Sequence, residues 1–243
     1  MTAYTVTATQ SVNTSAGMQL YVAVLTNASL AGTPATGTST TAYDCSVTTT
    51  QVGSIVAGAI ASLNSSSALT ALANTTLTQY SDTTNSTVYA GYTTSTTASP
   101  GATTYGSSTA FNSFYGACGA EIIPASGGSV AVDGSSPAAV TSVSATALTT
   151  ASFTPPGGSL LVATVATDGN GSGAVTMTGS SSPVLTWTQR VSVVSSVGGT
   201  FAYIGVLTAP VPAAAPSLLE DALTNTPVIV AGRAGWRGAS HSR

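Results

Sequence analysis

Charged side chains are scarce in this chain of 243 residues, and lysine is absent. Only 5% of the residues are charged, and the four basic ones are all arginines. Residues 1–189 hold five of the seven acidic residues and no basic side chain. Proteins that bind nucleic acids need lysine or arginine to contact the phosphates. We therefore expect the body of this protein to bind neither DNA nor RNA.

The chain also lacks the residues of the common catalytic motifs. Its one histidine, His241, is the third residue from the C-terminal end. A Ser-His-acid triad holds its histidine in a cleft beside the nucleophile, which a terminal position does not favour. A phosphate-binding loop of the G-x-x-x-x-G-K type requires the missing lysine. Because no group of titratable residues suggests a tuned site, we expect neither enzymatic activity nor a cofactor.

Metal ligands are equally sparse. Residues 168–173, Asp-Gly-Asn-Gly-Ser-Gly, resemble the first half of a calcium loop, but its twelfth position is Gly179 where a bidentate acid is needed. This pattern favours a glycine-rich hairpin turn over a metal site. Cys45 and Cys118 lie in no Cys/His ligand pattern. They leave two interpretations open, a disulfide or two buried free thiols.

Long apolar runs are missing as well. Runs such as residues 55–61 are far shorter than the roughly 20 residues of a membrane-spanning helix. The N-terminal residues show neither the basic stretch nor the apolar stretch of a secretory signal. We expect no membrane segment and no signal peptide.

Serine and threonine, unlike charged residues, are abundant in this chain. The chain has 35 serines and 43 threonines, about a third of its length, while 43% of its residues are hydrophobic and its mean hydropathy is +0.36. Disorder requires low hydrophobicity together with high charge, so the chain is expected to fold. Its length suits two domains.

Strand signals dominate the pattern, because β-branched residues alternate with small polar ones and turn residues recur every 8 to 12 positions. The first two expected strands are residues 4–9 and 19–25, and residues 53–63 are among the further ones. We expect an all-β protein of two tandem antiparallel β-sandwich domains, of the jelly-roll or immunoglobulin-like type, with an extended C-terminal tail. The expected boundaries are 1–126 for the first sandwich, 127–142 for a linker and lead-in, 143–217 for the second sandwich and 218–243 for an anchoring segment.

The two halves resemble divergent copies of one another. Residues 53–61 align with residues 158–166, and two later blocks, 76–79 with 186–189 and 87–91 with 200–205, follow in the same order. The second copy differs at its end. Where the first finishes with the expected strand at 114–123, the second runs into a sequence rich in alanine and proline.

The C-terminal tail is chemically distinct from the body, because three of the four arginines lie in its last eleven residues. A frayed end is the ordinary interpretation. We favour a partner-binding anchor, because tryptophan and arginine are common interface hot spots. The apolar run 228–230 either completes the second sandwich or adds to a partner's sheet edge. The candidate partner-binding residues are Val228, Ile229, Val230, Arg233, Trp236, Arg237 and Arg243.

Aromatic residues offer a secondary hypothesis. Tyr89, Tyr92, Tyr105 and Tyr115 lie close together in the sequence and could form a platform for sugars. Alternation within strands more often buries such rings in a sandwich core, which is also the interpretation that we favour for Trp187.

Several short motifs carry a family resemblance. Residues 150–162, 185–189 and 208–213, together with the linker 133–137 and the opening 5–11, are similar to segments of β-sandwich virion proteins of tailed phages that infect actinobacteria. The resemblance implies a structural protein displayed on the virion surface, and the expected lack of a signal peptide implies that it is made in the host cytoplasm. The resemblance carries over no active residues.

Within that class we favour a capsid decoration or head-fibre protein, because a compact body with one anchor suits a repetitive lattice. A minor tail protein is one alternative, and a carbohydrate-binding module for host adhesion is another. The expected partners are phage capsid or tail proteins, further copies of the chain as a homo-oligomer or symmetric array, and, for the adhesion alternative, a host surface glycan.

Overall fold

The computed structural model describes most of the first 213 residues. The described residues are 2–11, 17–29, 34–37, 42–63, 68–81, 86–110, 115–142, 144–168, 175–180, 184–197 and 200–213. They form sixteen β-strands and no helix, and the paired strands are antiparallel. The predicted all-β antiparallel class is therefore confirmed. Nothing helical in this part of the chain has the length and apolarity of a membrane span.

Seven strands form one β-sandwich, which we call sandwich 1. They are β3 (Pro34–Gly37), β4 (Ala42–Thr49), β5 (Ile55–Leu63), β6 (Thr75–Ser81), β7 (Ser86–Thr93), β8 (Gly101–Ala110) and β9 (Tyr115–Ile122). The larger sheet has the order β3-β9-β5-β7-β6, and the smaller sheet pairs β4 with β8. The core between the two sheets contains Tyr43, Val47, Ile60 and Tyr105.

The other nine strands form sandwich 2, which combines both ends of the described chain. They are β1 (Thr5–Gln10), β2 (Met18–Thr26), β10 (Ala131–Val132), β11 (Val140–Ser142), β12 (Ala147–Thr149), β13 (Leu160–Asp168), β14 (Val175–Ser180), β15 (Thr188–Val197) and β16 (Thr200–Pro210). The larger sheet has the order β10-β2-β13-β16-β15, with β11 also beside β2, and the smaller sheet has the order β12-β1-β14. Val6, Leu20, Leu161 and Val165 lie in the core between them.

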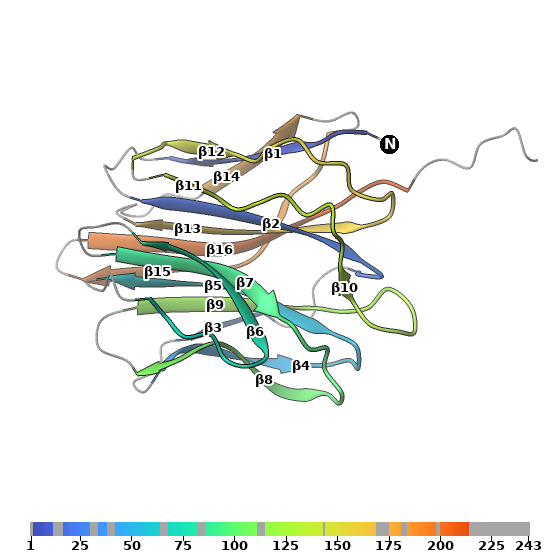
Figure 1. Cartoon of the computed structure of the whole chain (residues 1–243), viewed down its shortest axis with the longest axis horizontal. Helices are drawn as coiled ribbons and strands as arrows, with labels where there is room; N and C mark the ends of the chain where they lie inside the picture. Colours follow the sequence, from blue (N-terminus) through green and yellow to red (C-terminus); the bar gives the residue numbers. More distant parts are fainter. Residues whose placement is uncertain are drawn as a thin grey trace, which may run out of the picture. The chain divides into compact units, whose positions relative to one another are not determined.

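The two larger sheets also pack against each other, so the strands form four layers (Figure 1). A third core lies between them and contains Leu25 and Val162 from sandwich 2 with Ile55 and Ala57 from sandwich 1. We call it the shared core. The smaller sheets, β12-β1-β14 and β4-β8, lie on the outer sides of this stack.

The layers explain the composition of the strands. In β1 buried positions alternate with more exposed ones, which is typical of a strand that is covered on one face only. In β13, which has a sheet on each side, all residues from 161 to 167 are buried. A strand covered on both faces needs apolar or small residues throughout, and its sequence Leu-Leu-Val-Ala-Thr-Val-Ala-Thr meets that need.

The chain does not divide into sheets at the predicted boundary. β1 and β2, which we assigned to a first domain at 1–126, pair instead with β12, β14 and β13 of the second half. The predicted linker 127–142 supplies β10 and β11, which pair with β2. The physical reason is that alternation specifies a strand but not its partner, which is chosen by contacts distant in the sequence.

The internal duplication, by contrast, matches positions in the sheets. The aligned segments 53–61 and 158–166 lie largely in β5 and β13, the third strand of each larger sheet. The block pair 76–79 and 186–189 lies in β6 and at the start of β15, the fifth strand of each larger sheet, and the pair 87–91 and 200–205 lies in β7 and β16, the fourth. The two sandwiches therefore share their strand order.

Candidate functional site

The predicted partner-binding residues lie outside the described residues. This concerns Val228, Ile229, Val230, Arg233, Trp236, Arg237 and Arg243, all of which belong to residues 214–243. The anchoring role of segment 218–243 therefore stays a prediction. The candidate sites that follow come from the described part of the chain.

The predicted tyrosine platform is not assembled on the surface. Tyr89 and Tyr105 are buried in the core of sandwich 1, where the Tyr105 hydroxyl donates a hydrogen bond of 2.8 Å to the Gly58 carbonyl. The Tyr89 hydroxyl accepts a hydrogen bond of 3.1 Å from the Leu69 backbone N–H. The Tyr115 side chain is outside those described. Tyr89 and Tyr105 thus fill a core, as strand alternation favoured.

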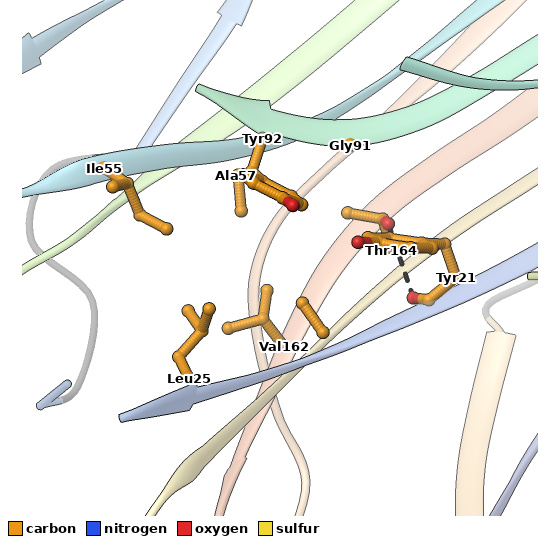
Figure 2. A pocket seen from close by; sticks show the side chains of 9 residues that line it. Tyr21, Leu25, Ile55, Ala57, Gly91, Tyr92, Val162 and Thr164 are labelled. Atoms are coloured by element: carbon orange, nitrogen blue, oxygen red, sulfur yellow. Dashed lines mark hydrogen bonds between the residues drawn. The ribbon is translucent and has the colours of Figure 1, made fainter. Parts of the chain in front are cut away.

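Tyr92 instead stacks on Tyr21 across the shared core, with ring centroids 6.3 Å apart and an angle of 18° between the rings (Figure 2). Burial, followed by the proximity of Tyr92, raises the pKa of Tyr21 well above its ordinary value. The hollow beside the pair is too narrow to admit a water molecule. Because the rest of its lining is mostly apolar and includes Leu25, Ile55 and Val162, the hollow is a packing gap between two sheets and not a ligand site.

A polar hollow of sandwich 1 is open to solvent and holds about 390 Å³. It is lined by Leu72, Asn74, Ser95, Thr96, Thr97, Ala98, Ser99, Ala102, Thr103 and Thr104. None of these side chains is charged or aromatic. Asn74 is held there by hydrogen bonds, because its side-chain N–H donates to the Thr104 carbonyl at 3.5 Å and its oxygen accepts from the Thr75 hydroxyl at 3.2 Å. The hollow therefore offers neutral hydrogen-bonding groups to solvent.

The carboxylate of Glu121 forms the most concentrated polar cluster among the described residues. It accepts hydrogen bonds from the Thr50 backbone N–H at 2.7 Å, the Thr50 hydroxyl at 2.9 Å, the Gln51 N–H at 3.2 Å and the Ser54 hydroxyl at 2.7 Å. Burial raises the pKa of Glu121, but these hydrogen bonds lower it by more, so the net pKa lies below the ordinary value. All its partners belong to the turn between β4 and β5. Glu121 therefore fixes that turn.

Metal binding finds no support in the described residues. No three His, Cys, Asp or Glu side chains among them gather in a way that could hold an ion. Most of the predicted glycine-rich turn that starts at Asp168 lies outside the described residues, so the choice between turn and calcium loop stays as the sequence left it.

The two cysteines are buried free thiols in facing sheets of sandwich 1. The Cys45 thiol lies 3.6 Å from the Ala35 carbonyl, to which it donates. Burial, with a smaller contribution from Asp44, raises the pKa of Cys45 to about 11. Burial likewise raises the pKa of Cys118. The sequence left open a disulfide or two buried free thiols, and the structure shows the free thiols.

Arg190 and Trp187 both contact other parts of sandwich 2. The Arg190 side chain donates a hydrogen bond of 2.7 Å from its Nε to the Thr208 hydroxyl, beside an irregularity in the pairing of β15 with β16. Trp187, which we expected in a core, is partly buried and packs against the core of sandwich 2.

The role of Glu121 was missed by the sequence reasoning, although a signal was present. In β9 the alternate residues Cys118, Ala120 and Ile122 point into the shared core, so Glu121 points the other way, into sandwich 1. An acidic residue at an inward-facing position of a strand indicates either hydrogen-bond donors around its carboxylate or a functional site.

Comparisons of the chain with protein families, with curated proteins and with solved structures found no match.

Proposed function

We propose that this chain is a non-enzymatic structural protein of the exterior of a phage particle, of the capsid decoration or head-fibre type. The observation that carries the proposal is that several polar side chains among the described residues hold turns and strands in place. Glu121 fixes a turn, the Tyr105 hydroxyl bonds to a carbonyl inside sandwich 1, and Arg190 joins two strands of sandwich 2. The sequence resemblance to virion proteins of tailed phages points in the same direction.

The low charge supports a location in a dense array. A net charge of −3 over 243 residues makes the electrostatic repulsion between neighbouring copies weak, so many copies can lie close together on one particle. A surface rich in serine and threonine supplies hydrogen-bonding groups to water without adding charge. Both properties suit a protein that is displayed in many symmetric copies.

The test is binding to particles of the parent phage that were prepared without this protein. We would compare the full chain with a version that ends at Ser217, because residues 1–213 form a compact unit of their own. Saturable binding of the full chain to capsids, lost in the shortened version, is the expected result. Binding to tails alone would replace the proposal by a minor tail protein, and equal binding of both versions would contradict an anchor at 218–243.

A glycan-binding adhesion module is the second candidate, and the polar hollow of sandwich 1 is the observation that favours it. Its neutral hydroxyl and amide groups are of the kind that sugars bond to, although the hollow has no aromatic ring for stacking. A screen of the full chain against host surface glycans tests this function. Binding that Thr103→Val weakens, and that the distant change Thr176→Val leaves intact, would favour adhesion over a purely structural role.

A further inference from the structure

The first two strands of the chain occupy places that belong to the end of a sandwich. In sandwich 1 the last two strands are β8, which pairs with β4, and β9, which lies between β3 and β5. In sandwich 2 the corresponding places are filled by β1, which pairs with β12, and by β2, which lies between β10 and β13. The bridge from Ala71 to Ser107 on β8 even matches the pairing of β14 with β1.

The strand registers show the same correspondence residue by residue. Ile55 on β5 lies opposite Ile122 on β9, and the aligned Leu160 on β13 lies opposite Leu25 on β2. All four residues belong to the shared core. A shift of one residue in the pairing of β2 with β13 would exchange the two faces of β2. A strand without this correspondence would therefore be as likely to turn the opposite face toward the shared core.

The opposite faces of these strands agree as well. Ile60 lies opposite Ala117 in the core of sandwich 1, and Val165 lies opposite Leu20 in the core of sandwich 2. The second copy, read from residue 131 onward, therefore ends after β16 without its last two strands. The N-terminal pair β1 and β2 completes it.

One chain connection attaches this closing pair to the rest of the described protein. It lies between Ser29, whose N–H donates a hydrogen bond to the Ile123 carbonyl, and Pro34 at the start of β3, which belongs to the other sandwich. Without the pair, sandwich 2 would have an open slot in both of its sheets, with unpaired backbone groups on β12, β13 and β14. Because buried backbone groups need hydrogen-bonding partners, a sandwich 2 with this slot open is unfavourable.

We propose that the pair β1 and β2 is exchanged between two copies of this chain, each closing the sandwich 2 of the other. A second copy fits the slot best because it restores every contact of the closed chain, including the bond between the Thr7 and Thr149 hydroxyls at 2.8 Å. The crossing point between the copies lies between Ser29, which bonds to the Ile123 carbonyl, and Pro34 on β3, so the pairing of the described strands is kept, which is the condition for a strand exchange of low cost. The small net charge of −3 opposes the approach of two copies only weakly.

This inference rests on the sheet pairing and goes beyond the proposed function. Exchange would join neighbouring copies through their backbones, so that each chain holds part of another. The joined copies would separate only when two strands leave a sandwich, which is slower than the release of a surface contact.

The experiment places a pair of cysteines across the closing strands of the full chain. In Thr7→Cys with Thr149→Cys, the two residues are direct partners of β1 and β12 on an exposed face. Two preparations with tags of different mass are mixed over a range of concentrations, with some samples held in urea just below the unfolding transition. After oxidation and quenching, a denaturing gel without reductant separates the products. We expect a product with the mass of two chains, carrying both tags, whose fraction rises with concentration.

A matched control uses the equivalent strands of sandwich 1. Ser46→Cys with Thr104→Cys joins β4 to β8, direct partners that belong to one continuous segment. We expect this variant to give only oxidised single chains. The pair Thr5→Cys with Ser180→Cys probes the other side of β1 and replaces the first reporter if that one fails to fold. Single-chain products from both reporters at every concentration would overturn the exchange.

Discussion

At the scale of single residues, the protein keeps one negative charge inside by surrounding it with donors. Glu121 is 0% exposed, and its four hydrogen bonds come from a turn of the same sandwich. An ionised carboxylate accepts hydrogen bonds with both of its oxygens, whereas a neutral amide accepts with one oxygen and donates from its nitrogen. The turn between β4 and β5 therefore depends on the charge and not only on the shape of this side chain.

The change Glu121→Gln tests that dependence. The amide has only one accepting oxygen and carries no charge, so its hydrogen bonds to this turn are fewer or weaker, and we expect the free energy of unfolding to fall by about 2 kcal/mol. Urea unfolding followed by circular dichroism measures the loss. Asp133→Asn is the matched control, because Asp133 accepts a hydrogen bond from the Ser135 N–H in a turn nearer the surface. Equal losses in the two variants would contradict the special role of Glu121.

The pH dependence of stability follows from the same site. Hydrogen bonds hold the pKa of folded Glu121 below its ordinary value of 4.5. The stabilisation is therefore complete above pH 4.5 and is lost as the pH falls through the lower, folded pKa. We expect the difference in unfolding free energy between the parent chain and Glu121→Gln to be constant near neutral pH and to shrink below about 4.5. A difference that grows on acidification would have the wrong sign.

At the scale of strands, local sequence was sufficient to find the elements but not to pair them. The expected strand at 53–63 is observed as β5 (Ile55–Leu63), and the one at 19–25 as β2 (Met18–Thr26). Alternation and turn residues act within a few positions, so they specify these segments. The partner of β2 is β13, more than a hundred residues away, and no local pattern encodes that choice.

The central strand β5 also shows why glycine is needed between sheets. A side chain on Gly58 would place its Cβ 2.6 Å from the Cys118 carbonyl oxygen and 2.8 Å from the ring of Tyr105. Both neighbours are fixed, the first as backbone and the second by its hydrogen bond to the Gly58 carbonyl. The glycine therefore lets β9 and the Tyr105 ring approach β5 closely.

We expect Gly58→Ala to lower the free energy of unfolding by about 1–3 kcal/mol, because overpacking forces strands or rings apart. Gly134→Ala is the control, since nothing lies within 4 Å of a Cβ at that position. That variant should change the stability by no more than about 0.5 kcal/mol. Thermal or urea unfolding of both variants gives the comparison. An unaffected Gly58→Ala would show that the sheets are less tightly packed than the structure indicates.

At the scale of the molecule, the two sandwiches share the strand order of their larger sheets and do not follow each other as two consecutive segments of the chain. The two halves are similar in sequence, and the second departs from the first after residue 208, where proline and alanine are frequent. The sequence does not reveal that strands from the other end of the chain lie in sandwich 2. The strands at 5–10 and 18–26 read as ordinary first strands, because no local pattern assigns them to that sandwich.

The central claim is that β1 and β2 are the last strands of sandwich 2. The most direct test is a circular permutant in which Ala213 is joined to Thr2 through a linker of about six residues, with new ends between Ser29 and Pro34. Tyr4 and Val211, near the two joined ends, belong to the same core. We predict that the permutant, now two sandwiches in simple sequence, unfolds in one cooperative transition at close to the urea concentration of a parent chain that ends at Ala213. A permutant that stays unfolded or insoluble, while that parent chain folds, would contradict the account.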